Sequence, residues 1–484
     1  MNILTQITSF ITKNIEKNIK NYNLENTLNA NTLFTFNNYI SMVNCIDNIS
    51  YDFCTYLYSS FIKQIDDAFF NSSYRKQFCD VINIGQRNII TLFGEVSFER
   101  RYYHDNLKNE NYYFVDQILS IKPYSRFDPF VCAKVCEVSS HDSYAKAGRT
   151  VSELIGKRLK FNDNKDKILI NRAQARNIVM NFPIPDVDYG TRNNVKKLFV
   201  MLDEKWVHSQ YNYDEDGNKK DFMVKACVIF ETVEEVYKKR KKKNSKIRYK
   251  LVGKHVLSSI DGDLKKQLDN YIFNTYDVEY IDELVFMGDC ASWITAFPEG
   301  FKYHKNMKIK FSMDGFHYSQ AIENICTKKY QDLVNILKDY CKNNDKDSFV
   351  TVCNSLIELH PERKETIESK MNYILNNWKY IQVYYYDNPM RCCMESNISH
   401  CFADIFTARP RAYSEKGLRQ LLKLRMLKVN NQDIQKIYFG VLNNEFKSEI
   451  LTNTEIIFSS NKKNNDIFYL PQWLYKCLNQ CNSF

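Results

Sequence analysis

Three aspartates and one glutamate lie at the ends of predicted strands and helices, where catalytic and metal-binding side chains are often found. Asp203, Asp289 and Asp314 each follow a short apolar run, and Glu395 opens a segment with helical spacing. A short apolar run that is bounded by charge is typical of a buried strand. Each aspartate is therefore predicted where a strand leaves the core, as either a solvated cap or a rigidly held ligand.

Five predicted strands set the order in which these acids occur. Three neighbouring strands, a helix and two further strands follow one another, which is the order of a ribonuclease-H-like sheet. In that order the first and fourth strands lie side by side, so Asp203 and Asp289 are expected to meet, and a later helix brings Glu395 to them. The predicted strands cover residues 198–202, 222–230, 246–257, 283–288 and 308–313.

The side chains of this predicted cluster suit a hard divalent metal ion. Carboxylate oxygens are the ligands that Mg²⁺ and Mn²⁺ prefer. Two such ions about 4 Å apart activate the attacking oxygen and stabilise the leaving oxygen in phosphoryl transfer. We therefore predict that Asp203, Asp289 and Glu395 are catalytic and bind Mg²⁺ or Mn²⁺. A surface cap is the alternative for each acid alone, but the strand order favours a shared metal site.

The residues before the predicted sheet fall into three regions. Residues 1–85 have apolar residues at helical spacing and are expected to pack or to dimerise. Residues 86–130 contain a predicted β-hairpin that turns at Gly94. Residues 131–190 contain two short amphipathic segments with Arg, Gln and Asn on their surface, as in a helix-turn-helix, and two prolines end this region.

The predicted sheet and the residues after it form two more regions. The catalytic domain is expected over residues 196–410, with a helical insertion at about 318–378. Residues 411–484 form a basic C-terminal region that is helical at first. We therefore predict an α/β protein with a ribonuclease-H-like catalytic domain and a helical insertion, preceded by helical and β-hairpin or helix-turn-helix-like regions.

Basic side chains in several of these regions are candidate DNA contacts. Those of the hairpin either contact phosphates and sugars or face solvent on an exposed strand. The basic run at residues 238–243 lies between two predicted strands, where it either grips a nucleic-acid backbone or forms a solvated face. The predicted DNA-binding residues are Arg100, Arg101, Arg172, Arg176, Lys241, Lys242 and Arg409.

The amino-acid composition limits the classes of protein to which the chain can belong. The 484-residue chain has a net charge of +10, which permits a polyanionic partner. Its 15 cysteines are scattered without a CxxC pair, so a disulfide framework or a zinc ribbon is not expected. The N-terminus lacks the pattern of a signal peptide, and no apolar stretch is long enough for a membrane span. We expect a cytoplasmic protein.

Short motifs occur along the chain in a specific order and spacing. They are Phe93–Tyr103, Pro123–Arg126, Ser143–Ala147, Asp203-Glu204 with Val207 and Gln210, Gly288-Asp289 with Trp293-Ile294, Asp314–His317, and Glu395 through Ser399-His400 to Arg409-Pro410. Together they resemble the ISLre-two family of bacterial insertion-sequence transposases, which is similar to Mutator-like DDE transposases. The resemblance covers roughly residues 85–430.

The resemblance implies a DNA transposase with a DDE triad, which maps onto Asp203, Asp289 and Glu395. It also implies that Asp314 and His317 correspond to the Cys/Asp-x-x-His motif of Mutator-like enzymes, which gives His317 a role near the active site. From chemistry alone, a histidine here is more often structural. The implied partners are the terminal inverted repeats, target DNA and further copies of the chain, in a bacterial cytoplasm and on the nucleoid when bound to DNA.

Two departures from the family pattern bear on activity. Ser396 stands where a glycine is expected, and residues 411–413 differ from the usual sequence after Arg-Pro. Neither departure removes an acid. Two alternatives stay open, namely a catalytically inactive DNA-binding protein derived from a transposase and a ribonuclease-H-like nuclease or resolvase.

Overall fold

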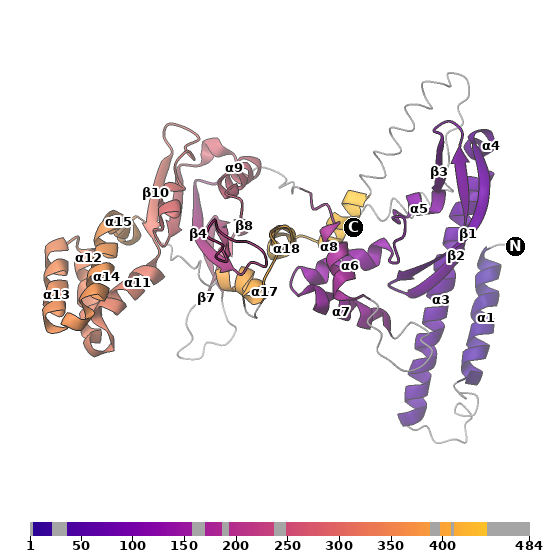
Figure 1. Cartoon of the computed structure of the whole chain (residues 1–484), viewed down its shortest axis with the longest axis horizontal. Coiled ribbons are helices and arrows are strands. Elements are labelled where there is room, and N and C mark those ends of the chain that lie inside the picture. Colours follow the sequence, from indigo (N-terminus) through magenta and orange to yellow (C-terminus); the bar gives the residue numbers. More distant parts are fainter. Residues whose placement is uncertain are drawn as a thin grey trace. The chain divides into compact units, whose positions relative to one another are not determined.

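A computed structural model of the chain describes residues 3–21, 36–156, 170–185, 193–236, 248–387, 397–407 and 411–442. The chain divides into two compact units (Figure 1). Unit 1 contains the residues up to Pro185 together with those from Asp433 onward, and unit 2 contains Asp186–Gln432. The structure is a mixed α/β protein. In the part of the chain that is described, no helix combines the length and the apolar character needed to cross a membrane.

Unit 1 combines helices with a three-stranded sheet of order β1-β2-β3. Its elements are α1 (Ile3–Asn21), α3 (Phe36–Asn71), α4 (Ser73–Phe78), β1 (Cys79–Thr91), β2 (Gly94–Asp105), β3 (Glu110–Tyr113), α5 (Phe114–Ile118), α6 (Pro129–Ser139), α7 (Tyr144–Gly156) and α8 (Arg172–Met180).

The predicted hairpin of unit 1 is confirmed by the antiparallel pairing of β1 with β2, which turns between Thr91 and Gly94. Gly94 has a φ of 119°, a conformation that favours glycine. The inward side chains of the hairpin, among them Ile89 and Val96, pack against Ile62 of α3. The hairpin is longer than predicted, because β1 begins at Cys79, inside the segment that was predicted to be helical.

Helices α6, α7 and α8 contact one another and form a small helical cluster in unit 1. A Cβ atom on Gly148 of α7 would lie only 2.3 Å from the carbonyl oxygen of Ile170, so α7 approaches the start of α8 closely. The Ser152 hydroxyl donates to the carbonyl of Gly148 (2.6 Å) and accepts from the N–H of Ile170 (3.0 Å). Asn171 and Gln174 then form a capping box that starts α8.

Unit 2 is built on a five-stranded sheet of order β10-β9-β4-β5-β8. Strand β4 pairs in parallel with β9, and β9 with β10, whereas β5 is antiparallel to both β4 and β8. The strands are β4 (Lys197–Val207), β5 (Phe222–Phe230), β6 (Thr232–Val236), β7 (Arg248–Val252), β8 (His255–Ser259), β9 (Glu283–Gly288) and β10 (Lys308–Met313).

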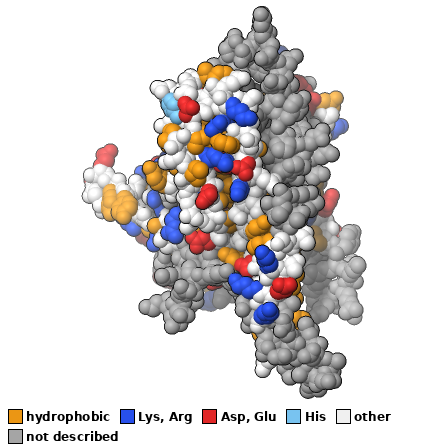
Figure 2. Space-filling model, turned by 90° about the vertical axis from the view of Figure 1, so that its right-hand side faces the viewer, with side chains coloured by type: hydrophobic (Ala, Val, Ile, Leu, Met, Phe, Trp, Pro, Cys, Tyr) orange, Lys and Arg blue, Asp and Glu red, His pale blue; other side chains and the backbone are white. Residues whose placement is uncertain are grey.

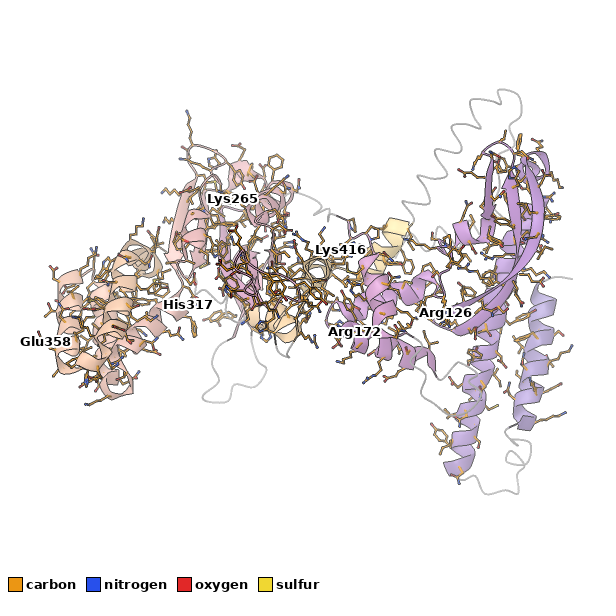
Figure 3. The ribbon with its side chains drawn as sticks, viewed as in Figure 1. Arg126, Arg172, Lys265, His317, Glu358 and Lys416 are labelled. Carbon is orange, nitrogen blue, oxygen red and sulfur yellow. The ribbon has the colours of Figure 1, made fainter. Side chains whose placement is uncertain are left out.

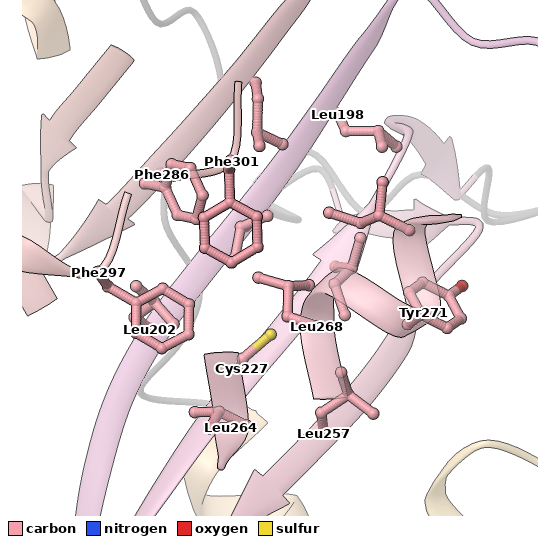
Figure 4. Packing of buried hydrophobic residues seen from close by; sticks show 14 of the residues in the cluster. Leu198, Leu202, Cys227, Leu257, Leu264, Leu268, Tyr271, Phe286, Phe297 and Phe301 are labelled. Carbon is pink, nitrogen blue, oxygen red and sulfur yellow. The ribbon is translucent and has the colours of Figure 1, made fainter. Parts of the chain in front are cut away.

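One face of this sheet packs against α9 (Leu264–Thr275). Figure 4 shows the contact, in which Leu202 and Phe286 of the sheet meet Leu268 of α9 and Phe297 and Phe301, which follow β9. The even-numbered apolar residues of β4 face this core. The alternation of a strand then places the odd-numbered side chains on the opposite face.

The extent of the predicted third strand is wrong. Residues 248–252 form β7, which pairs with β6 in a separate two-stranded sheet, and only β8 joins the main sheet. Gly253 separates the two strands with a φ of 64°. A Cβ atom at this position would lie 2.6 Å from the side chain of Glu231. The chain therefore bends there, which periodicity alone does not predict.

A helical insertion, defined here as residues 315–387, follows β10 and has its own core. Trp378 and Tyr318 are among the buried side chains of that core. Its helices are α11 (Gly315–Cys326), α12 (Gln331–Lys342), α13 (Lys346–Leu359), α14 (Lys364–Asn376) and α15 (Trp378–Tyr386). The helical insertion is thus present and extends beyond its predicted limits.

Unit 2 ends with a helical segment at residues 397–407 and with α18 (Glu415–Val429). Ile398, Phe402 and Ile405 are buried, in agreement with the helical spacing predicted for the segment that Glu395 opens. The predicted helix is present over these residues, with a π-helix at residues 399–403 before α17 (Asp404–Phe406). π-Helical turns are often found at functional sites.

Candidate active site

Three aspartates lie at one edge of the main sheet of unit 2. Met201 of β4 pairs with Met287 of β9, so Asp203 and Asp289 each lie two residues further along two neighbouring parallel strands. Asp314 directly follows Met313, which pairs with Gly288. Because the carboxyl ends of parallel strands meet at the same edge of a sheet, the register brings these three positions together.

Gly288 allows the strands that carry these aspartates to approach closely. A Cβ atom at Gly288 would lie 2.6 Å from the side chain of Ile294 and 3.1 Å from the carbonyl oxygen of Leu202. A larger residue there would push β9 away from β4. In the pair Gly288-Asp289, the glycine therefore permits close packing of the strands, and the aspartate is the predicted metal ligand.

The aspartate after β9 is held in a tight loop. The Asp289 carboxylate accepts from the N–H of Ala291 (3.0 Å), and its backbone carbonyl accepts from the hydroxyl of Tyr373 (2.6 Å). Cys290 follows with a φ of 68°, which is uncommon for a residue other than glycine. Burial, with the charges of Asp289 and Asp314, raises the pKa of the Cys290 thiol to about 12, so this thiol stays protonated at neutral pH.

Asp314 and His317 form a pair at the start of α11. Asp314 is buried, accepts from the N–H of Phe316 (2.9 Å) and is 2.8 Å from Nδ1 of His317. This hydrogen bond raises the pKa of His317, although burial opposes the shift, and the charges of Asp314, Asp289 and Asp203 add to it. The charges of all three aspartates therefore act on His317, which is labelled in Figure 3.

Glu395, the third predicted ligand, lies outside the described residues. The helical segment that follows it is held firmly. Arg425 donates to the carbonyls of His400 (2.7 Å) and Cys401 (2.9 Å), and Arg411 donates to that of Ile405 (2.9 Å). The segment after Glu395 thus has fixed contacts within unit 2, while the position of Glu395 itself stays a prediction.

The carboxylates at this edge of the sheet suit a hard cation, but the predicted three-carboxylate metal site also requires Glu395. Among the described residues, no group of three or more His, Cys, Asp or Glu side chains is arranged to hold a metal ion. Asp203 and Asp289 supply carboxylate oxygens, which fit Mg²⁺ or Mn²⁺. The three-carboxylate metal site therefore stays a prediction.

Two predicted DNA-binding residues are engaged inside unit 1. Arg100 is buried, forms an ion pair with Asp116 and lies 3.5 Å from the ring centre of Tyr113. Arg101 forms ion pairs with two adjacent acids of α3, the nearer at 2.8 Å. A guanidinium that is held in such pairs is not available to a phosphate. Both arginines are therefore omitted from the DNA interface proposed below.

The other predicted DNA-binding residues differ in what the structure says of them. Arg172 and Arg176 are exposed one helical turn apart on α8, as an interface would need. Figure 3 labels Arg172 at the start of this helix. On the face shown in Figure 2, the Lys and Arg side chains of the described residues are interspersed with Asp and Glu. Lys241, Lys242 and Arg409 lie outside the described residues.

Two aromatic residues near the aspartates were not assigned a role from the sequence. Trp293 donates its indole N–H to the carboxylate of Glu204 (2.5 Å), and the ammonium of Lys225 lies 4.7 Å from the ring centre of Trp293. Tyr373 reaches Asp289 from α14. Trp293 belongs to a motif of the resemblance, whereas nothing in the local sequence around Tyr373 indicated its contact.

Comparisons with known proteins identify a family and several relatives within it. The model of an uncharacterised protein family, UPF0236, matches residues 39–441. The UPF0236 protein TTE0402 of Caldanaerobacter subterraneus subsp. tengcongensis is 26% identical over 385 residues, which is 78% of this chain and 71% of the relative. The UPF0236 protein TTE2489 of the same organism is also 26% identical, over 78% of this chain and 76% of its own.

One solved structure is similar at a low level. It is described as a Drosophila P element transposase strand transfer complex, with 13% identity and a TM-score of 0.20, over 68% of this chain and 84% of that one. A likeness of that degree carries no argument about fold or activity.

Proposed function

The chain belongs to the uncharacterised protein family UPF0236, and from that premise we propose that it is a DNA transposase of an insertion sequence, of the ISLre-two kind. It would bind the ends of its element and catalyse metal-dependent strand cleavage and strand transfer. The observation that carries this proposal is the parallel register of β4 with β9, which sets Asp203 beside Asp289. The catalytic domain would be ribonuclease-H-like, because the strand order β10-β9-β4-β5-β8 matches the order expected for that sheet.

The site residues would share the work of strand cleavage. Asp203, Asp289 and Glu395 would hold Mg²⁺ or Mn²⁺, which when bound activates a water for attack on the phosphodiester and stabilises the leaving 3′ oxygen. In a second step the freed 3′-hydroxyl would attack target DNA. The hydrogen bond with Asp314 raises the pKa of His317, and in its protonated form His317 would donate a hydrogen bond to a phosphate oxygen at the same edge.

The DNA contacts proposed for unit 1 rest on α7 and α8. Arg172, Arg176 and Asn177 are exposed on α8, and Arg149 is exposed on α7. Arginine and asparagine are the side chains that most often read base edges in the major groove. The close crossing at Gly148 fixes α8 against α7, as a helix-turn-helix requires.

The names of relatives add independent support for a mobile gene. One UPF0236 relative, 26% identical to this chain, carries a name that joins eleven designations from one organism. Repeated copies of an insertion sequence in a genome would produce such a set. A housekeeping nuclease would not be expected to occur in this way.

The experiment uses the purified full chain with Mg²⁺ and DNA that bears the ends of the element. Asp289→Asn is expected to lose strand cleavage and strand transfer by a factor on the order of a thousand, because metal binding needs the carboxylate. Asp282→Asn is the matched control, since Asp282 is exposed and directly precedes β9, at the end away from Asp289. Cleavage by Asp289→Asn at the rate of the wild type would contradict the proposal.

The same assay separates the alternatives. Cleavage without strand transfer would indicate a nuclease or resolvase. Specific binding of the element ends without cleavage, unchanged in Asp203→Asn, would indicate an inactive protein that has kept its DNA-binding surface.

A further inference from the structure

The loop that carries Asp289 is held from outside the sheet. Tyr373 belongs to α14 of the helical insertion, and its hydroxyl donates to the backbone carbonyl of Asp289 at 2.6 Å. Tyr373 is half-buried and lies 84 residues further along the chain. The helical insertion therefore makes a short, directed contact with the main chain of a proposed catalytic residue.

The next residue in this loop connects two cores. Cys290 packs against the core between the sheet and α9, and it also packs against the core of the helical insertion. Its φ of 68° is costly for a residue with a Cβ atom, so neighbouring contacts must hold it. The two contacts with the helical insertion, at Asp289 and at Cys290, can supply that constraint.

A further close contact lies within the helical insertion, next to Asp314. A Cβ atom on Gly315 would approach the ring of Tyr384 to 2.8 Å, so α15 lies directly against the start of α11. Gly315 follows Asp314, the partner of His317. Within the helical insertion, α15 thus packs against the residue that follows Asp314, while Tyr373 of α14 contacts Asp289.

We infer that the helical insertion serves as a positioning element and that Tyr373 is a positioning residue for Asp289. Its hydrogen bond fixes the strained loop at residues 288–291, so that the Asp289 carboxylate keeps the orientation set by the N–H of Ala291. Without the hydroxyl, the carbonyl of Asp289 loses its partner and the loop relaxes. The consequence for metal binding rests on the proposed function, whereas the consequence for the loop does not.

The test compares Tyr373→Phe with Tyr386→Phe in the full chain. Tyr386 is the matched control, because its hydroxyl also donates to a backbone carbonyl within the helical insertion, that of Lys342 at 2.5 Å. Two readouts are needed. The first is the dissociation constant for Mn²⁺, measured by electron paramagnetic resonance. The second is the rate at which iodoacetamide alkylates Cys290, measured by peptide mass spectrometry at one pH.

We expect Tyr373→Phe to weaken Mn²⁺ binding by about three- to tenfold, which is the worth of one hydrogen bond. Alkylation of Cys290 should become several-fold faster, because its packing depends on the same loop. Tyr386→Phe should match the wild type in both readouts, and the thermal unfolding midpoint should be similar in both variants. A purely structural role for Tyr373 would lower that midpoint without changing either local readout.

The outcomes for the two proposals are distinguishable. If Mn²⁺ binding is the same in the wild type and in Asp289→Asn, the proposed metal site fails, and Cys290 alkylation alone decides on Tyr373. If Asp289→Asn loses Mn²⁺ but Tyr373→Phe equals Tyr386→Phe in both readouts, the metal site stands and the positioning role is overturned.

Discussion

The two units of the chain use charge in opposite ways. In unit 1, arginines are neutralised by acids of the same unit, as the buried Arg100 is by Asp116 and the half-buried Arg101 by Asp66. In unit 2, three aspartates converge at one sheet edge with a histidine whose pKa is raised by them. Paired charges hold a fold together, whereas like charges brought together cost stability and are kept where they serve chemistry. The contrast indicates that the paired charges of unit 1 stabilise its fold, whereas the clustered acids of unit 2 form a candidate active site.

The largest expected effect on stability is in unit 1. Asp116→Asn leaves the Arg100 guanidinium buried without its counter-charge, which should destabilise unit 1 by about 3 kcal/mol. Asp142→Asn is the control, because its ion pair with Lys146 is at the surface and should be worth less than about 1 kcal/mol. Hydrogen exchange of β2 peptides during denaturant unfolding measures both. Equal small effects would mean that the buried pair is not structural.

The matching change in unit 2 should not destabilise it. Asp289→Asn removes one of three neighbouring carboxylates, so hydrogen exchange of β9 and β4 peptides should be unchanged or slower while activity is lost. Faster exchange in both strands would show that Asp289 is a structural residue and would remove the contrast between the units.

Acid is expected to weaken unit 2 through His255. Burial lowers the pKa of His255 to about 4, and its ring stacks on Tyr271. The unfolded chain binds a proton at this histidine near pH 6.5, so between about pH 6.5 and 4 the unfolded state holds more protons than the folded state. The stability of unit 2 should therefore fall as the pH drops through this window, by up to about 3 kcal/mol.

The measurement for His255 is hydrogen exchange of β8 peptides from pH 7 to 4, corrected for the intrinsic rate. A His255→Phe variant, which keeps a stacked ring, should show a smaller loss of protection over the same range. An equal loss in the variant would assign the acid sensitivity to other groups.

A smaller effect of opposite sign is expected in unit 1. Burial raises the pKa of Asp128 to about 6, and its carboxylate caps α6 by accepting from the N–H of Val131. The folded state then holds the extra proton between about pH 4 and 6, so this group gives unit 1 more stability as the pH falls through that window. Asp128→Asn keeps a good cap and should stabilise unit 1 at pH 7 by about 1–2 kcal/mol.

Thermal unfolding of Asp128→Asn at pH 7 and pH 4.5 checks this expectation. The gain over the wild type should be larger at pH 7 and should shrink at the lower pH. A gain that does not depend on pH would show that the carboxylate is not responsible for it.

Local patterns were sufficient to find the strands and the acids that follow them. The runs before Asp203, Asp289 and Asp314 are short and apolar, and the structure has a strand at each. Asp203 is nevertheless still within β4 and not beyond its end. These predictions succeeded because a buried strand requires a run of consecutive apolar residues, which is visible in the local sequence.

Features that depend on distant partners could not be predicted in this way. The local sequence around Arg101 does not distinguish it from a phosphate-binding arginine, because its partner Asp66 is 35 residues away. Tyr373 is 84 residues from the carbonyl that it contacts. The bend at Gly253 lies against Glu231, which is 22 residues earlier between β5 and β6. Only the folded chain reveals which long-range pair forms, and the position of Glu395 is a question of the same kind.

The most direct test of the central claim is a crystal structure of the chain with Mn²⁺ and DNA from the element's end, with the metal located by anomalous scattering. The account predicts Mn²⁺ bound by the carboxylates of Asp203, Asp289 and Glu395, at about 2.2 Å from their oxygens. Carboxylates more than about 8 Å apart with no shared metal would contradict it.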